Sequence, residues 1–346
     1  MKNGTKGFSS RRIFAAVFWT ALMPVAALAA PSGYHVIKTV PLGGEGGFDY
    51  LNMDPSTGYL YVTRGNHLMI VDVEAGKLLS DVTGLTGIHG TAFADGHAYV
   101  SEGGSNKVTV LDARSFRKLS EIPVGTRPDS ILFDPASHRL FTFNGGSKDA
   151  TAVDTASGKV LGTVALGGKP EAASSDNAGT IFVNIEDKNE IVAFDAKSLA
   201  IKAHYVLSNC ESPSGQAADV AHNRLYSVCD GGVMAVTDAK TGKVITTVKI
   251  GDGPDAARFD PATGMVFSSN GKSGTITVAH EDSPDKYTVL DNVPTAPRAR
   301  TMELDPKTHR LFVVAAEVKP GIPTTENPHP RATVVPDTFR VLVLGR

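Results

Sequence analysis

One position in a repeated segment of the chain carries polar side chains, most of them ionisable. It lies five residues before a recurrent Asp, and its occupants are Asp49, His89, Asp129, Glu171, Ser214, Asp255 and Arg300. Carboxylate oxygens together with an imidazole suit a divalent metal ion. Crowded carboxylates also raise one another's pKa unless a cation or an Arg compensates their charge. If the fold brings these positions together, they form a candidate site.

A second set of polar residues follows a recurrent hydrophobic run, where the chain would leave a strand toward the same face. This set comprises Arg64, Glu102, Asn144, Glu186, Asp230, Asn270 and Glu317. The metal ligands that we expect are Asp49, His89, Asp129 and Glu171, because they come from consecutive repeats. The further ligand contacts that we expect are Asp255, Arg300, Glu102, Asn144, Glu186 and Asn270. An organic polar ligand, or solvated residues that bond loop N–H groups, are the alternatives.

The elements that must position these residues form an internal repeat, Asp-Pro-x-x-x-x-Leu-Tyr/Phe-Val. Its aromatic residues are spaced 38 to 45 residues apart, at Tyr61, Tyr99, Phe141, Phe182, Tyr226, Phe267 and Phe312. Each unit holds four strand-like runs separated by Gly, Asp and Pro turns. A unit of this length with four strands is typical of a propeller blade. We therefore predict an all-β, seven-bladed β-propeller in which the first strand of each blade lines a central channel.

The repeat also predicts how the ring closes. The seventh unit ends after its third strand, and an orphan strand at residues 34–40 precedes the first unit. The end of this strand resembles fourth-strand ends at residues 164–168 and 248–251. We expect the N-terminal strand to complete the last blade, within one domain that spans residues 30–346.

The second strands carry a family resemblance. Tyr61-Val62-Thr63-Arg64 and Tyr99-Val100-Ser101-Glu102 resemble the signature of the YVTN-repeat, or YncE-like, β-propellers. The resemblance extends over nearly the whole mature chain. It implies a seven-bladed propeller, usually exported, and no single shared chemistry. The fourth signature residue, Asn, is present only at Asn144 and Asn270.

The segment 1–29 has the features of an export signal. A basic start precedes an apolar run from Ile13 to about Ala26, and Ala27-Leu28-Ala29 fits a cleavage site. The pair Arg11-Arg12 also resembles a twin-arginine signal, so both export routes stay open. The predicted mature protein is periplasmic or secreted, without a membrane anchor. We expect a monomer.

Charge and motifs exclude several functions. Cleavage would remove four basic residues and change the formal net charge from −2 to −6. This acidic balance argues against a nucleic-acid partner. The sequence has no haem-attachment motif and no nucleotide-binding motif, so a divalent metal is the cofactor that we consider.

The two cysteines predict a disulfide. Cys210 precedes the first strand of the fifth blade and Cys229 ends its second strand, which makes them neighbours in an oxidising compartment. Among the histidines, we interpret His138, His222 and His309 as equivalent turn residues.

A Pro-rich loop at residues 316–338 departs from the repeat and lies over the candidate face. We expect either a semi-rigid lid, a surface for another exported protein, or an elongated loop.

Two functions follow. The first is a binding or scaffold protein that holds a small polar molecule, a metal or a protein partner. The second is a lactonase-like or other metal-assisted hydrolase, in which His89 would be the general base and Arg300 would stabilise an oxyanion.

Overall fold

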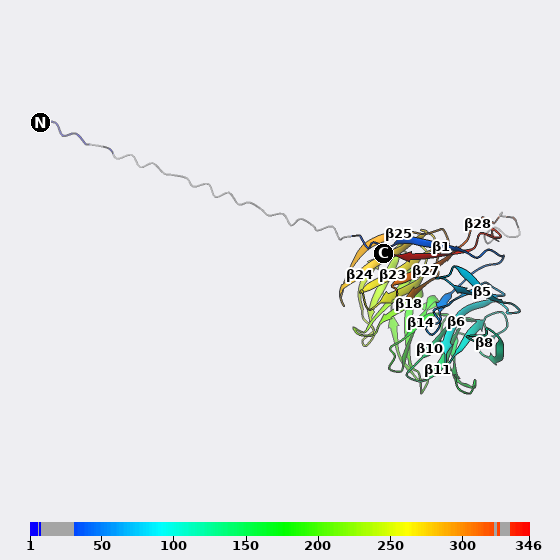
Figure 1. Ribbon diagram of the computed structural model, residues 1–346. Helices are drawn as coiled ribbons and strands as arrows, with labels where there is room; N and C mark the ends of the chain where they lie inside the picture. The colour runs from blue at the N-terminus through cyan, green and yellow to red at the C-terminus, as the bar shows by residue number, and fades with distance from the viewer. Residues whose placement is uncertain (6, 8–30, 322–323, 326–332) are drawn as a thin grey trace.

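The computed structural model describes residues 1–5, 7, 31–321, 324–325 and 333–346, and its strands form a ring of seven four-stranded antiparallel sheets (Figure 1). The predicted seven-bladed β-propeller is therefore confirmed. Most of the predicted export signal, and the centre of the Pro-rich loop, lie outside the described residues. Within the described part of the chain, no helix has the length and apolar composition needed to cross a membrane.

The two inner strands of each blade contain the recurrent motif. The innermost strands, which contact one another around the channel, are β2 (Leu51–Met53), β6 (Ile88–Ala94), β10 (Pro128–Asp134), β14 (Pro170–Ser175), β18 (Glu211–Asp219), β22 (Pro254–Asp260) and β26 (Met302–Asp305). The second strands are β3 (Leu60–Thr63), β7 (His97–Glu102), β11 (Arg139–Asn144), β15 (Thr180–Ile185), β19 (Arg224–Asp230), β23 (Met265–Asn270) and β27 (Arg310–Ala315). The second strands are almost wholly buried, because both of their faces pack against neighbouring blades.

The two outer strands lie at increasing distance from the channel. The third strands are β4 (Leu68–Asp72), β8 (Lys107–Asp112), β12 (Asp149–Asp154), β16 (Glu190–Asp195), β20 (Val233–Asp238), β24 (Thr275–Ser283) and β30 (Arg340–Gly345). The outer strands are β5 (Lys77–Val82), β9 (Lys118–Pro123), β13 (Val160–Ala165), β17 (Ile201–Val206), β21 (Val244–Lys249), β25 (Lys286–Pro294) and β1 (His35–Pro41). Most third strands end in an Asp that accepts a backbone N–H of the following turn, as Asp154 does from Ser157 at 2.8 Å.

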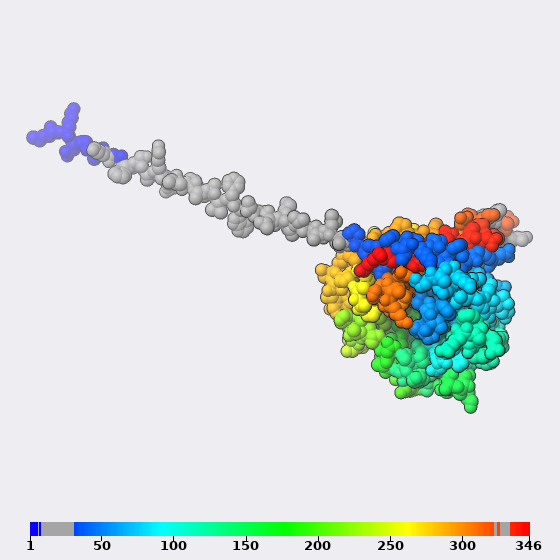
Figure 2. Space-filling model, viewed as in Figure 1, coloured from blue at the N-terminus to red at the C-terminus, as the bar shows by residue number. Residues whose placement is uncertain are grey.

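The N-terminal strand closes the ring, as predicted. β1 pairs antiparallel with β30, so that Val40 lies opposite Val341 in the seventh blade. In Figure 1 the blue β1 runs beside the red C-terminal strand, and Figure 2 shows the two segments in contact at the surface. Val40 is buried and packs in one cluster with Phe339 and Val341. This pairing removes the free edge that would otherwise remain on the last blade.

The predicted disulfide between Cys210 and Cys229 is present in the fifth blade. Both cysteines are buried in the core between the fourth and fifth blades. In the chain-entropy model, a link that closes a loop of this length contributes about 3 kcal/mol to stability.

One prediction about the turns is wrong. His138 and His309 are equivalent, since both have positive φ in the turn between the first and second strands, but the third member of this group is Asn223. His222 lies one residue earlier in its turn, because Asp219 pairs with Arg224 in the same register as Asp134 pairs with Arg139.

The described parts of the Pro-rich loop form the stem of a hairpin. β28 (Val318–Lys319) pairs with β29 (Thr333–Val334). Asp337 fixes this stem to the segment after β1, because its carboxylate accepts the Gly44 N–H at 3.1 Å.

Candidate functional site

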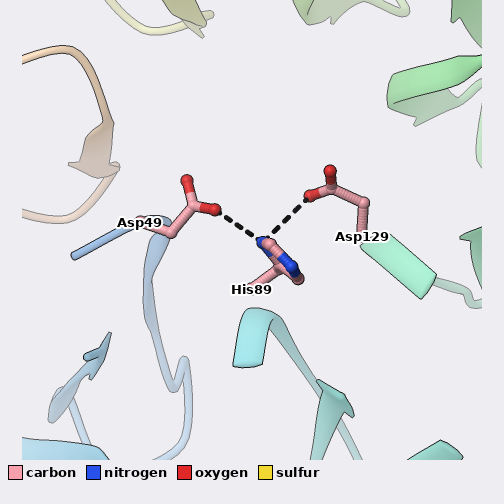
Figure 3. Close-up of side chains that lie close together, drawn as sticks. All are labelled: Asp49, His89 and Asp129. Carbon is pink, nitrogen blue, oxygen red and sulfur yellow. Dashed lines mark hydrogen bonds and ion pairs between the residues drawn. The ribbon is translucent and has the colours of Figure 1, made fainter. Parts of the chain in front are cut away.

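The structure brings the predicted ring of polar residues to one mouth of the channel. Each residue lies just before or within the first part of an innermost strand. His89 is central to one side of this ring, since its Nδ1 is 2.7 Å from Asp49 Oδ2 and 3.7 Å from Asp129 Oδ1. Figure 3 shows these three side chains pointing toward one another from three blades. Their ligand atoms all lie within 4.8 Å of one another.

Arg300 lies between Asp255, on the other side of the ring, and Asp49, which also contacts His89. Its guanidinium lies 3.2 Å from Asp255 and 3.5 Å from the second carboxylate oxygen of Asp49. Asp49 therefore contacts both a His and an Arg. One Arg between two carboxylates compensates only part of the acidic charge at the mouth.

Glu171, the fourth expected metal ligand, makes a separate ion pair. Its carboxylate is 2.6 Å from Lys169 Nζ, and the same Lys also pairs with Glu186. Lys169 is a member of the site that sequence reasoning missed. Burial is the main cause that raises the pKa of Glu171, and the negative charge of Asp129 adds to it.

The electrostatics of the ring show an excess of negative charge. Burial raises the pKa of Asp129, and the nearby Asp49 raises it further. Burial also raises the pKa of Asp255 to about 7, although Arg300 acts in the opposite direction. The hydrogen bond to Asp49 raises the pKa of His89, against the effect of burial. Protons therefore bind tightly here, and a cation would compete with them.

Hydrogen bonds from neighbouring blades fix the backbone of the ring. In four of the blades, the side chain at the third position of the second-strand motif donates to the carbonyl of the ring residue in the next blade. The bonds run from Thr63 to His89 (2.8 Å), from Ser101 to Asp129 (2.6 Å), from Asn184 to Ser214 (3.0 Å) and from Ser269 to Arg300. Sequence reasoning did not assign these residues a role, although the recurrent hydroxyl after the aromatic was a visible signal.

A glycine allows the His89 ring to approach the backbone of its own blade closely. A Cβ atom at Gly103 would lie only 2.9 Å from Nε2 and Cδ2 of His89. Any larger residue at this position would displace the imidazole from its place between the two carboxylates.

Three of the expected ligand contacts do not face the mouth. Glu102, Asn144 and Asn270 are fully buried and bond within their own blades. Glu102 accepts the Thr86 N–H at 2.9 Å, and the two Asn side chains donate to threonines of the third strands at 3.0 and 2.9 Å. We correct the expectation for these residues, because a side chain without exposed area cannot contact a ligand.

Arg64 is also buried, and it holds the loop that enters the first blade. Its guanidinium donates to the carbonyls of Gly47 at 3.0 Å and Glu45 at 2.6 Å. The guanidinium carbon lies 3.7 Å from the centre of the Phe339 ring. Burial lowers the pKa of Arg64 to about 10. Sequence reasoning placed this residue at the mouth, whereas it supports the loop beside it.

Two cavities open at the mouth, on either side of Arg298 and Arg300. The larger, about 700 Å³, includes Asp49 and His89 and is bordered by Val334 of the hairpin stem. The smaller, about 370 Å³, includes Glu186, Ser214 and Asp255. The mouth therefore has room for a small molecule next to the ring of charges.

A third cavity of about 730 Å³ lies at the opposite end of the channel. It is lined by apolar side chains such as Phe93 and Phe133 and also by ionisable residues such as Asp54, Glu303 and Arg310. Both ends of the channel thus carry ionisable residues, and the ring that contains His89 lies at the mouth.

Comparisons with known proteins support the fold. No protein-family model and no curated protein matches this sequence. Among solved structures, a chain of the "Crystal Structure of Mitotic Checkpoint Complex" is 14% identical, with a TM-score of 0.71 over 98% of this chain and 99% of that chain. A chain of Kuenenia stuttgartiensis hydrazine synthase is 15% identical, with a TM-score of 0.69 over 84% and 96%. The RRP9 WD40 repeats are 12% identical, with a TM-score of 0.72 over 91% and 99%. At these identities the likeness shows the propeller fold alone.

Proposed function

We propose that this protein is an exported β-propeller binding protein whose channel mouth binds a divalent cation through Asp49, His89 and Asp129. One observation carries the proposal. Two carboxylates and an imidazole from three consecutive blades place their ligand atoms within 4.8 Å of one another. Mixed oxygen and nitrogen ligands favour a first-row transition metal or zinc over Mg²⁺ or Ca²⁺.

The charge of the mouth supports a cation as the ligand. Asp129, Glu171 and Asp255 all have raised pKa values, mainly because burial disfavours their negative charge. A bound cation would stabilise the charged carboxylates and displace the proton that His89 shares with Asp49. The cavity of about 700 Å³ beside His89 leaves space for water or a small polar molecule to complete the coordination.

Export is part of the same proposal. The segment 1–29 has the order of features of a signal peptide, and the buried Cys210–Cys229 disulfide is compatible with an oxidising compartment. The resemblance to YVTN-repeat propellers agrees with a periplasmic or secreted protein.

A metal-assisted hydrolase is the second candidate function. The observation that favours it is the hydrogen-bonded pair of His89 and Asp49 at 2.7 Å, on the wall of a cavity that also includes Arg300. A His oriented by a carboxylate can act as a general base toward water. Arg300 would then stabilise negative charge that develops on a substrate oxygen.

Metal retention tests the binding proposal. Mature protein purified without chelator is dialysed against Mn²⁺ or Zn²⁺, and bound metal is counted by inductively coupled plasma mass spectrometry. We expect Asp129→Asn and His89→Gln each to lose one equivalent relative to the unsubstituted protein. His67→Gln is a matched control, because His67 makes an equally short 2.6 Å contact with Asp81 outside the channel mouth.

An unchanged metal content in both mouth variants would contradict the binding proposal. The hydrolase is tested separately on a panel of lactones and esters. Turnover that is lost in His89→Ala would favour the enzyme, whereas no turnover across the panel would favour binding alone.

A further inference from the structure

A second group of possible metal ligands lies on the opposite face of the ring, between the fifth and sixth blades. Asp219 ends β18, His222 lies in the turn that follows, and Glu281 lies in β24 of the next blade. His222 Nδ1 is 2.6 Å from Asp219 Oδ2 and 3.3 Å from Glu281 Oε1. The three ligand atoms lie within 4.8 Å of one another.

His222 replaces a hydroxyl that other blades use at this turn position. In four other blades, the residue three positions after the Asp at the end of the first strand is a Ser or Thr. Its hydroxyl donates a hydrogen bond to that Asp. These pairs are Thr57 with Asp54 (2.8 Å), Ser137 with Asp134 (2.6 Å), Thr263 with Asp260 (2.6 Å) and Thr308 with Asp305 (2.6 Å). In the fifth blade an imidazole takes this place, and Asp219 remains buried.

Glu281 is a second departure from the repeat, in the neighbouring blade. Its N–H donates to the carbonyl of Gly264, as the N–H of Ala239 does to Asn223 and that of Ala196 to Gly179. The equivalent residues are small or apolar: Val73, Ala113, Thr155, Ala196 and Ala239. A carboxylate has therefore replaced a small side chain at the point that faces His222.

The carboxylate of Glu281 is only partly satisfied in this position. Its side chain is 4% exposed, and Oε1 makes no hydrogen bond among the described residues. The other oxygen accepts the hydroxyl of Tyr226 at 3.2 Å. Nδ1 of His222 carries at most one hydrogen, and Asp219 lies nearer to it than Glu281 does. Oε1 thus points at a nitrogen whose hydrogen is directed to Asp219.

The positive charge of Arg224 acts on Glu281, but this side chain is already paired with two other carboxylates. Arg224 is engaged with Asp238 at 2.8 Å and with Asp285 at 2.6 Å. Among the described residues, the two carboxylates therefore have no positive charge dedicated to them when His222 is neutral.

We propose that Asp219, His222 and Glu281 bind a divalent transition-metal ion that links the fifth blade to the sixth. Two carboxylate oxygens and one imidazole nitrogen suit Zn²⁺ or Mn²⁺, and the imidazole disfavours Mg²⁺ and Ca²⁺. The ion replaces the proton on Nδ1 and satisfies Oε1 of Glu281. This site is separate from the channel mouth, since it lies beyond the other end of β18.

Two substitutions test the site because each restores a residue that the repeat uses elsewhere. His222→Thr restores the turn hydroxyl, and Glu281→Ala restores the small residue. We expect each variant of the mature protein to lose one equivalent of Zn²⁺ or Mn²⁺ in equilibrium dialysis. Each variant should also lose part of the rise in Tm that the metal causes in the unsubstituted protein. His309→Thr is the control, because His309 faces Asp260 at 2.8 Å and belongs to no group of three possible metal ligands among the described residues.

The outcome is independent of the mouth site. If His222→Thr and Glu281→Ala lose bound metal but Asp129→Asn does not, the result supports this inference and contradicts the binding proposed for the mouth. Loss in Asp129→Asn alone overturns the inference. Circular dichroism establishes that each variant is folded, and if Glu281→Ala unfolds, His222→Thr decides the test by itself.

Discussion

At the scale of single residues, the channel mouth has more acidic than basic groups. Asp49 contacts both His89 and Arg300, while Asp129 lies farther from His89, at 3.7 Å. Arg300 divides its charge between Asp49 and Asp255. We therefore expect protons and a bound cation to compete for these groups, so that cation binding depends on pH.

We predict that cation affinity at the mouth rises as the pH increases from about 6 to 8. The hydrogen bond to Asp49 raises the pKa of His89, and burial raises that of Asp129, so protons compete with the metal at the acidic end of this range. Titration calorimetry with Mn²⁺ at several pH values measures the effect. An affinity that is independent of pH would contradict the assignment of His89 as a ligand.

Another residue of the ring, Asp255, should stabilise the metal-free protein less as the pH rises. Burial raises the pKa of Asp255 to about 7 in the folded protein, so the folded state binds this proton more tightly than the unfolded chain does. Its contribution to stability is present below about pH 4 and is lost as the pH rises through about 7. Thermal unfolding between pH 5 and 8 should show this loss, and Asp255→Asn should reduce it.

At the scale of elements, the closing strand combines the two ends of the chain in one blade. β1 supplies Val40 to a buried cluster that also contains Phe339 and Val341 of the C-terminal segment. The segment after β1 is then held by Arg64 and by Asp337, next to the larger cavity at the mouth. Arg64 and Asp337 thus connect the closure of the ring to the shape of the mouth.

We predict that Val40→Ala lowers the free energy of unfolding by roughly 2 kcal/mol, because it leaves a cavity in this cluster. Val36→Ala on the same strand is the matched control, since Val36 is 37% exposed and such a substitution changes stability little. Denaturant unfolding of both variants measures the difference. Equal stabilities would show that β1 contributes little to closure.

At the scale of the whole molecule, cavities open at both ends of the channel. One end gathers the ring of Asp49, His89 and Asp129, and the other combines aromatic residues such as Phe93 with ionisable residues such as Asp54 and Arg310. Every blade turns the start of its first strand to the same face, so any residue at that position is presented at the mouth.

We predict a radius of gyration of about 20 Å for the mature monomer, from the scaling for a compact chain of roughly 320 residues. Small-angle X-ray scattering in dilute solution measures it, with and without Mn²⁺. A value of about 25 Å, which the same scaling gives for twice the chain length, would indicate a dimer and would contradict the expected monomer.

The sequence by itself determined the architecture, because the repeat is a local and periodic signal. Seven copies of an aromatic at intervals of 38 to 45 residues specify seven blades, and the missing fourth strand of the last copy specifies closure by residues 34–40. Register within the repeat also placed Asp49, His89 and Asp129 on one face and Cys210 next to Cys229.

Only the tertiary structure decided which polar residues reach the mouth, because burial depends on side-chain direction and on the neighbouring blade. Glu102, Asn144 and Asn270 are the last residues of their second strands and turn inward to satisfy their own loops and third strands, whereas Glu186 lies one residue beyond the end of β15. Lys169 joined the site through a contact with Glu171 that no spacing indicated. His222 and Glu281 are far apart in the sequence and meet only because adjacent blades pack face to face. Contacts between blades depend on side-chain packing, so no pattern along the chain predicts them.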